Sequence, residues 1–243
     1  DVVKKTNTIS GFKEALKPGL ICMPIILSTI MFQQYGLLYT GVGKCAFISA
    51  FYIFLVPLLS TFVGGKVSKK IWLSVALAMV GLYLITMSSG FDAVNKGDII
   101  CLGAALMYSV YIIVVDKTAN KVDVIKFSAV QFTACGLVSF IPAAVLETGQ
   151  ITFDHIMYSI WPILLTGIVS CALGYTLQIV GQKYTNPDTC SIILSSETVF
   201  SLIAGMIFLN EVLMTKEYIG CAIMTIAIVL SVMPEKKGKI LDD

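Results

Sequence analysis

The sequence predicts an all-α integral membrane protein, and three observations lead to this class. Of its 243 residues, 57% are hydrophobic and 13% are charged, whereas a soluble domain keeps about a quarter of its residues charged. The apolar residues form blocks of about 20, the length at which a helix crosses a bilayer. These blocks lack the period of two that barrel strands show, and only helices or closed barrels satisfy their backbone in lipid.

Eight apolar blocks follow one another along the chain, and each is interpreted as one membrane-spanning helix. In order they cover residues 17–39, 42–64, 70–89, 97–116, 124–146, 157–180, 188–209 and 216–233. From the second block onward they are separated by the polar stretches GGKVSKK, SSGFDAVNKG, DKTANKVD, ETGQITFDH, QKYTNPD and NEVLMTKE. Gly, Pro, Asn and Asp in these stretches are typical of turns. The stretches are too short to hold a soluble domain.

The lysines predict how the chain sits in the membrane. With alternating loops, fourteen lysines fall on one side, and only Lys44, Lys96 and Lys216 fall on the other. Loops on the cytoplasmic side carry an excess of basic residues. We therefore expect both ends of the chain in the cytoplasm.

A repeat joins the two halves of the chain. QQYGLLYTGVGKC (33–45) and QIVGQKYTNPDTC (178–190) share the pattern Q-x-x-G-x-x-Y-T-x-x-x-x-C at an offset of 145 residues. Five predicted helices lie within this offset, and because five is odd the second copy is inverted relative to the first. Inverted repeats are typical of secondary transporters, whose substrate site lies near the membrane midplane between the repeats.

The repeat also predicts the domain organisation. Residues 1–89 would hold the last three helices of the first repeat, residues 97–233 the five helices of the second, and residues 234–243 a cytoplasmic tail. The counterparts of the first two helices of the second repeat would precede residue 1. We therefore expect an intact protein of ten helices, five plus five, of which eight are present here.

Glu197 is the first candidate functional residue, because it lies near the middle of the block 188–209. A charge at the centre of a bilayer costs several kcal/mol and is rarely left facing lipid. The residues on its helical face are Cys190, Ile193, Ser201 and Ala204, with Gly205 beside them. Apart from Ile193 they are small or polar, so we expect Glu197 to point into the bundle. It would either bind substrate or a coupling proton, or hold two helices together through hydrogen bonds.

Four further residues are candidates for polar contact with a ligand. Gln33 and Gln178 are equivalent positions of the repeat, and Gln131 lies in another apolar block. Tyr52 is the counterpart of Glu197 at the offset of 145. A tyrosine at that position would donate a hydrogen bond to the substrate or fill the seam between the repeats. The substrate-binding or coupling candidates are thus Glu197, Gln178, Gln33, Tyr52 and Gln131.

Other chemistry finds no support in the sequence. There is no GxxxxGK[ST], HExxH or GxSxG motif, and the seven cysteines have no CxxC spacing. We therefore expect no enzyme activity, no catalytic residue, no metal and no cofactor. The expected partners are a small-molecule substrate and the lipid bilayer, without nucleic acid, and the protein would be a monomer or a homodimer.

Three stretches resemble a known family. YTGVGKCAFISAFYIFLVPLLSTFVG, GYTLQIVGQKYT and SSETVFSLIAGMIFLNE are similar to the drug/metabolite transporter superfamily, specifically its bacterial EamA-type members. The resemblance implies ten helices in two inverted EamA repeats in the bacterial cell (inner) membrane. It also implies export of amino acids or related metabolites by alternating access, driven by the proton gradient or by the substrate's own gradient.

The chain departs from the family pattern at two positions. Thr198 stands where many members have proline, and Lys66 stands where an acidic residue is common.

Two functions other than transport stay open. The alternatives are a non-transporting membrane subunit or receptor, and a polytopic membrane enzyme acting on lipid substrates. A purified protein that moves solute saturably would exclude both.

Overall fold

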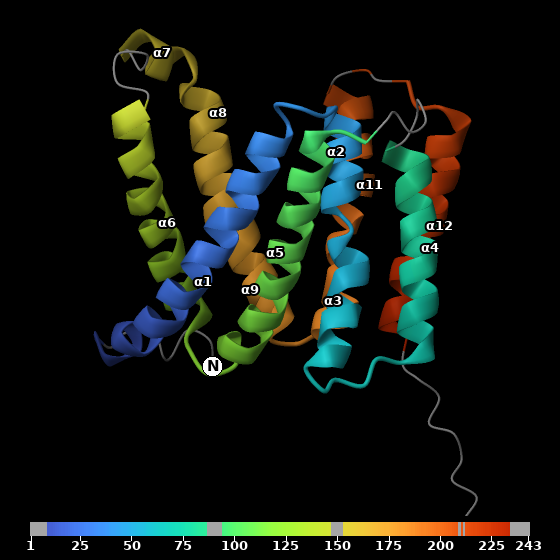
Figure 1. Ribbon diagram of the computed structural model, residues 1–243, viewed down its shortest axis with the longest axis horizontal. Coiled ribbons are helices and arrows are strands. Elements are labelled where there is room, and N and C mark those ends of the chain that lie inside the picture. Colours follow the sequence, from blue (N-terminus) through green and yellow to red (C-terminus); the bar gives the residue numbers. More distant parts are fainter. Residues whose placement is uncertain (1–8, 87–93, 147–152, 209, 211, 234–243) are drawn as a thin grey trace, which may run out of the picture.

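The computed structural model describes residues 9–86, 94–146, 153–208, 210 and 212–233. It is a bundle of helices that run roughly side by side (Figure 1). The predicted tail 234–243 and residues 1–8 lie outside the described residues. The helices are α1 (Ile9–Gly36), α2 (Val42–Ser49), α3 (Tyr52–Phe62), α4 (Lys69–Thr86), α5 (Lys96–Ala119), α6 (Val124–Leu146), α7 (Phe153–Tyr158), α8 (Ile160–Leu164), the π-helix η1 (Leu165–Tyr175), α9 (Thr176–Gln182), α10 (Pro187–Leu194), α11 (Ser196–Phe208) and α12 (Thr215–Val232).

The predicted class and number of spans are confirmed. Within the described residues, eight helical segments are long and apolar enough to cross a membrane, and no strand is present. Many large apolar side chains on the outside of the bundle are exposed, among them Phe200 and Ile207 of α11 and Leu177 of α9. Such a surface suits lipid, because apolar atoms gain nothing from contact with water.

Three of the eight spans are interrupted, which the sequence did not predict. The second span breaks between α2 and α3 at Ala50–Phe51, and the seventh breaks between α10 and α11 at Ser195. There the backbone closes tighter turns, with Phe51 N donating to Ile48 O and Thr198 N donating to Ser195 O, each at 3.1 Å. The sixth span passes from α8 through the π-helix η1 into α9.

The two breaks are related by the repeat. Ala50 and Ser195 are 145 residues apart, which is the offset of the repeated sequence pattern. Tyr52 is the first residue of the helix that follows one break, and Glu197 is the second residue of the helix that follows the other. A discontinuous helix brings backbone and side chains to the middle of a span, where transporters build their sites.

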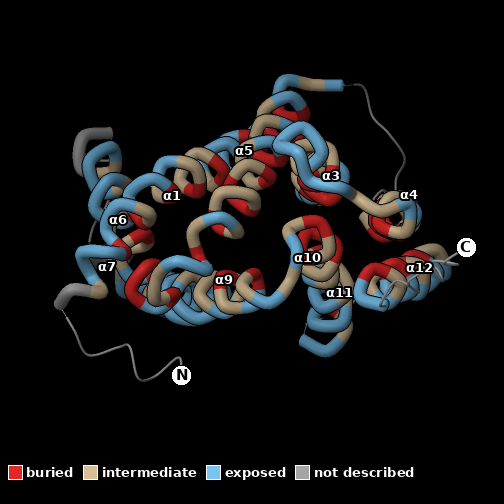
Figure 2. Tube along the Cα trace, turned by 90° about the horizontal axis from the view of Figure 1, so that it is seen from below, coloured by how far each residue is buried: buried red, intermediate tan, exposed pale blue. Residues whose placement is uncertain are grey.

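The helices form two facing rows. Seen along the bundle, α1, α5 and α3 line one side, while α9, α10 and α11 lie across from them (Figure 2). One apolar core cluster surrounds α3, α4 and α12, and a second surrounds α1, α5 and α6. Tyr108 of α5 packs against both clusters.

One end of the bundle carries most of the described lysines. We call it the lysine-rich end, and it holds the connections α3–α4, α5–α6 and α9–α10 (Figure 1). Its lysines include Lys66, Lys69, Lys70, Lys117, Lys121 and Lys183. The opposite end holds the connection between α1 and α2 and the start of α5, with Lys44 and Lys96.

Helices α4 and α12 approach closely because each contributes a glycine to the contact. A Cβ atom on Gly81 would lie 2.9 Å from the carbonyl oxygen of Gly220 and 2.9 Å from the backbone nitrogen of Met224. A Cβ on Gly220 would lie 2.8 Å from the carbonyl oxygen of Gly81. Small residues are how membrane helices bring their backbones together.

Gly81→Ala should therefore destabilise the protein. The added methyl meets backbone atoms that cannot rotate away, and overpacking of this kind costs about 1–3 kcal/mol. The melting temperature in detergent should fall by roughly 2–4 °C per kcal/mol. Gly136→Ala is the control, because a Cβ there meets nothing within 4 Å. Equal melting temperatures for the two variants would show that the glycine contact is not needed.

Candidate substrate site

A cavity lies beside the two helix breaks. Its volume is about 260 Å³, and we call it the midplane cavity. Its walls come from α1, α2, α3, α5, η1 and α11, so both predicted repeats contribute to it. The lining residues are Thr29, Gln33, Ala46, Ser49, Ala50, Tyr52, Ala104, Tyr108, Tyr175, Glu197, Thr198 and Ser201.

Glu197 is the one charged side chain among the described residues that line the midplane cavity. Its side chain is open to the cavity, and no described residue forms a hydrogen bond or an ion pair with it. Tyr52, Tyr108 and Tyr175 lie close enough to interact electrostatically with its carboxylate. The cavity thus offers one carboxylate, three phenol groups and several hydroxyls to a ligand.

The tyrosines are held in place by ring packing. The rings of Tyr52 and Tyr108 meet edge to face, with their centroids 4.9 Å apart. Tyr108 in turn stacks on Tyr111 at 6.0 Å. Aromatic pairs of this geometry contribute about 0.5–1.5 kcal/mol beyond the area that they bury. This packing fixes the wall formed by α3 and α5.

The five residues predicted from the sequence are not all brought together. Gln33, Tyr52 and Glu197 line the midplane cavity. Gln178 does not line the cavity, but its Oε1 accepts a hydrogen bond of 3.1 Å from the hydroxyl of Tyr108. Gln131 is fully buried away from the cavity, and its Nε2 donates to the Tyr111 hydroxyl at 2.9 Å.

Two of the three cavity tyrosines, Tyr108 and Tyr175, were not predicted from the sequence. Tyr108 lies in the middle of an apolar block, and Tyr175 lies three residues before Gln178. The spacing of Tyr175 and Gln178 places them on one helical face, which is a signal that could have found Tyr175. Nothing in the sequence around Tyr108 distinguishes it from a tyrosine that only packs.

A polar cluster lies at the end of the bundle opposite the lysine-rich end. We call Thr40, Lys44, Asn95 and Asp98 the Asp98 cluster. Asp98 accepts hydrogen bonds from Thr40 Oγ1 at 2.8 Å and from Asn95 N at 2.9 Å, and its Oδ2 lies 2.6 Å from Lys44 Nζ. The side chains of Lys44 and Asp98 are only 11% and 7% exposed. The cluster ties the α1–α2 connection and the start of α2 to the first turn of α5.

The start of α5 explains why Asp98 occupies this position. Asn95 accepts a hydrogen bond of 3.1 Å from the backbone nitrogen of Asp98, while Asp98 accepts one from the backbone of Asn95. This reciprocal arrangement satisfies amides that the first turn of a helix leaves unpaired. The Asp98 carboxylate therefore both caps the start of α5 and forms the ion pair with Lys44.

A pair of thiols lies next to the Asp98 cluster, on the side of the midplane cavity. Cys45 of α2 and Cys101 of α5 are both buried, and their Sγ atoms are 2.8 Å apart. Cys45 also contacts Ser49, which lines the midplane cavity. The two sulfur atoms are thus positioned between the Asp98 cluster and the cavity.

Mild oxidation should join Cys45 to Cys101. The two thiols would lose two protons and two electrons, which dissolved oxygen accepts through a copper–phenanthroline catalyst, and a disulfide would link α2 to α5. Peptide mass spectrometry under non-reducing conditions should find the linked peptides, and dithiothreitol should release them. Cys45→Ser should abolish the product and Cys135→Ser should leave it unchanged. Recovery of only unlinked peptides from the wild type would contradict the close approach of the two helices.

Comparisons with known proteins identify a family. The model of the family described as "EamA-like transporter family" matches residues 95–233. A protein of Archaeoglobus fulgidus, named "Uncharacterized transporter", is 30% identical over 220 residues, which are 90% of this chain and 68% of that protein. The "Threonine/homoserine exporter RhtA" of Salmonella typhimurium is 27% identical over 158 residues, which are 63% of this chain and 51% of the relative.

Two further matches are a second named exporter and a solved structure. The "Threonine/homoserine exporter RhtA" of Escherichia coli K12 is 26% identical over 174 residues, which are 69% of this chain and 57% of the exporter. The chain thus spans between about half and about two thirds of the length of these curated relatives. A solved structure titled "Crystal structure of protein" has a TM-score of 0.73 at 13% identity, covering 95% of this chain and 90% of its own. That likeness concerns the fold alone.

Proposed function

This chain belongs to the EamA-like transporter family and is a multi-pass membrane transporter, and from this premise we propose that it is a secondary carrier. It moves a small metabolite by alternating access, and the substrate is an amino acid or a related compound that leaves the cell. The two relatives named as threonine/homoserine exporters support this substrate class and this direction.

The observation that carries the proposal is the position of Glu197. An unpaired carboxylate halfway along a span is costly in lipid, yet here it is open to a cavity lined by hydroxyl and phenol groups. Because no described residue bonds to it, its carboxylate is available to a ligand in the cavity. A ligand that carries an ammonium group would supply the missing partner.

The repeat supports the alternating movement. Residues 1–89 and 97–233 act as the two repeats, and the breaks at Ala50 and Ser195 give each one a discontinuous helix beside the cavity. Rocking of one repeat against the other would open the cavity to one side and then to the other. In the described conformation the Asp98 cluster holds α2 against α5 and so favours closure at that end.

The orientation follows from the lysines. The lysine-rich end faces the cytoplasm, because basic loops remain on that side of a bacterial inner membrane. The Asp98 cluster then faces outward. For an exporter this conformation is the one that would accept substrate from the cytoplasm.

Purified protein in lipid vesicles tests the proposal. A thermal-stability screen with amino acids, nucleosides, sugars and polyamines comes first, because a ligand at 100 times its dissociation constant adds about 2.7 kcal/mol to the apparent stability. Each stabilising compound is then loaded into vesicles that contain only this protein. Saturable efflux of a compound that also stabilises the protein is the expected result. If every stabilising compound stays inside vesicles that carry correctly inserted protein, the carrier proposal is wrong.

A further inference from the structure

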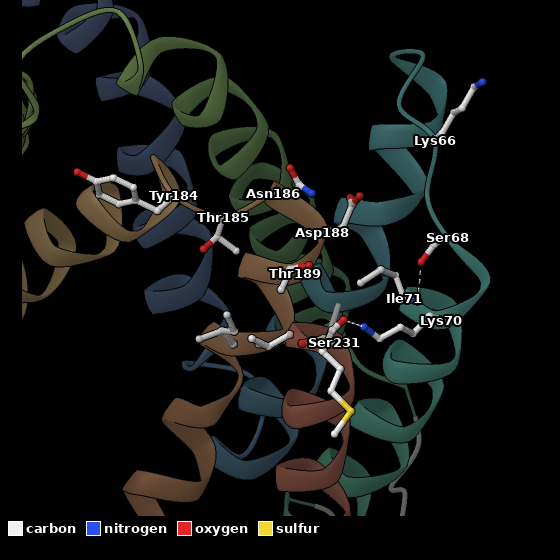
Figure 3. A pocket seen from close by; sticks show the side chains of 13 residues that line it. Lys66, Ser68, Lys70, Ile71, Tyr184, Thr185, Asn186, Asp188, Thr189 and Ser231 are labelled. Atoms are coloured by element: carbon white, nitrogen blue, oxygen red, sulfur yellow. Dashed lines mark hydrogen bonds between the residues drawn. The ribbon is translucent and has the colours of Figure 1, made fainter. Parts of the chain in front are cut away.

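A second cavity opens at the lysine-rich end. Its volume is about 510 Å³, and it lies between the start of α4, the α9–α10 connection and the end of α12 (Figure 3). We call it the end cavity. Most of its lining is polar, and it includes Asp188, the second residue of α10. Lys70 turns across the cavity and donates to the backbone carbonyl of Met233.

Asp188 is buried without full hydrogen bonding. Its side chain approaches Ser60 of α3, yet its Oδ1 has no partner among the described residues, and the residue is only 9% exposed. A second carboxylate, that of Asp116 in α5, lies close enough to interact with it electrostatically. Two carboxylates therefore lie near each other at this end, while Lys117 interacts with Asp116 and Lys66 and Lys70 line the end cavity with Asp188.

A polar stripe leads from this mouth toward the midplane cavity. Tyr175, Gln178 and Gln182 follow one another at spacings of three and four residues, so they share one face of the helix. Tyr175 lines the midplane cavity, and Gln178 bonds to Tyr108, which lines it as well. At the other end of the stripe the Gln182 side chain contacts Cys190, which is two residues beyond Asp188.

The stripe carries polar atoms that the protein does not satisfy. Gln178 Nε2, both polar side-chain atoms of Gln182, and Asp188 Oδ1 are buried and have no hydrogen-bond partner in the described part of the chain. Gln182 is 1% exposed. Each such atom would cost about 1–3 kcal/mol if it stayed unbonded. Buried polar groups without a protein partner normally bond to ordered water.

These unpartnered polar atoms follow one another along the bundle. Helices α5, α9 and α10 pack together here, and the series runs from Asp188 through Gln182 and Gln178 to Tyr108. Its two ends lie on the two cavities. At the opposite end of the bundle, the ion pair of Lys44 with Asp98 holds α2 against α5. The polar series therefore lies between the midplane cavity and the end cavity.

We propose that Asp188, Gln182 and Gln178 hold a file of ordered water that joins the two cavities and exchanges protons with Glu197. A proton that leaves the Glu197 carboxyl passes to the nearest water and is relayed to the carboxylate of Asp188 or Asp116. The return of a proton follows the same file in reverse. The other titratable groups along this route are Tyr52, Tyr108 and Tyr175 around Glu197 and Cys190 beside Gln182. At the end cavity, Lys66, Lys70 and Tyr184 accompany Asp188, and Lys117 accompanies Asp116. The importance of the file for transport rests on the proposed function.

Hydrogen–deuterium exchange at the Glu197 carboxyl tests the file without any substrate. Vesicles that hold the whole protein are brought to acid pH and transferred into deuterated water, and the carbonyl stretch of the protonated carboxyl is followed by infrared spectroscopy. Glu197→Gln identifies the band by removing it. Gln182→Met keeps the length of the side chain but removes the atoms that bind water. Exchange should slow by about tenfold or more, which equals about 1.4 kcal/mol of added barrier.

Gln131→Leu is the matched control, because this glutamine is also buried and has an unpartnered Oε1, but it lines neither cavity. In this variant the Glu197 carboxyl should exchange at the wild-type rate. If Gln182→Met does not fold, Gln182→Leu and Gln178→Met test the same series. Wild-type exchange rates in folded variants at both glutamines would overturn the water file. That result would leave the carrier proposal standing, whereas vesicles that transport nothing would overturn the carrier and not the file.

Discussion

Glu197→Gln is expected to weaken substrate binding by about 10- to 100-fold and to reduce transport in parallel. A hydrogen bond to a charged group contributes about 1.5–3 kcal/mol, and each 1.4 kcal/mol changes an equilibrium about tenfold. Glutamine has nearly the same size and keeps most hydrogen bonding, so the cavity stays intact while the charge is lost. Titration of the stabilising compound against melting temperature measures the change in affinity.

Glu217→Gln is the matched control for this experiment. Glu217 lies in the first turn of α12, where its carboxylate accepts a hydrogen bond of 2.6 Å from Met214 N, and it does not line the midplane cavity. Its substitution removes one negative charge from the same half of the chain. Binding and transport should stay at the wild-type level. Equal behaviour of Glu197→Gln and Glu217→Gln would remove Glu197 from the site.

Asp98→Ala is expected to cause the largest loss of stability, about 3–5 kcal/mol, because it removes one partner of a buried ion pair. It also removes the group that accepts a hydrogen bond from Thr40 and that caps the start of α5. The melting temperature in detergent should fall accordingly. The double variant Lys44→Met with Asp98→Leu should recover part of the loss, since it leaves no charge without its partner.

Asp154→Ala serves as the control for this prediction. Asp154 is exposed in the first turn of α7, where a charge interacts only weakly with the helix dipole. Its loss should cost less than about 1 kcal/mol. A melting temperature for Asp98→Ala equal to that of Asp154→Ala would mean that the Asp98 cluster adds nothing to the stability of the fold.

The number of helices could be predicted from the sequence because a bilayer sets one length for all of them. Every block of about 20 apolar residues had to be a helix, and turn-forming residues marked the ends. The breaks at Ala50 and Ser195 could not be predicted in this way. Ala50 lies within an apolar run, Ser195 begins the short polar stretch SSET inside a longer apolar block, and neither position carries a proline or a glycine. Hydropathy does not distinguish a straight span from a broken one.

The candidate site could be predicted in part. The repeat offset paired Tyr52 with Glu197, and both line the midplane cavity. Gln131 could not be distinguished from Gln33 by its sequence position, because which face of a helix meets the cavity depends on how the helices cross. The pairing of Lys44 with Asp98 was not predicted either, since the two residues belong to different spans and nothing in their spacing connects them.

The glycine contact between α4 and α12 has a mechanical consequence. These helices end the two proposed repeats, and their backbones touch at Gly81 and Gly220 without intervening side chains. Backbone against backbone resists sliding more than a layer of flexible side chains does. If one repeat tilts against the other, this line can serve as the fulcrum, and displacement grows with distance from it. Probes placed across α4 and α12 would then report a constant separation while the far side of the bundle opens and closes.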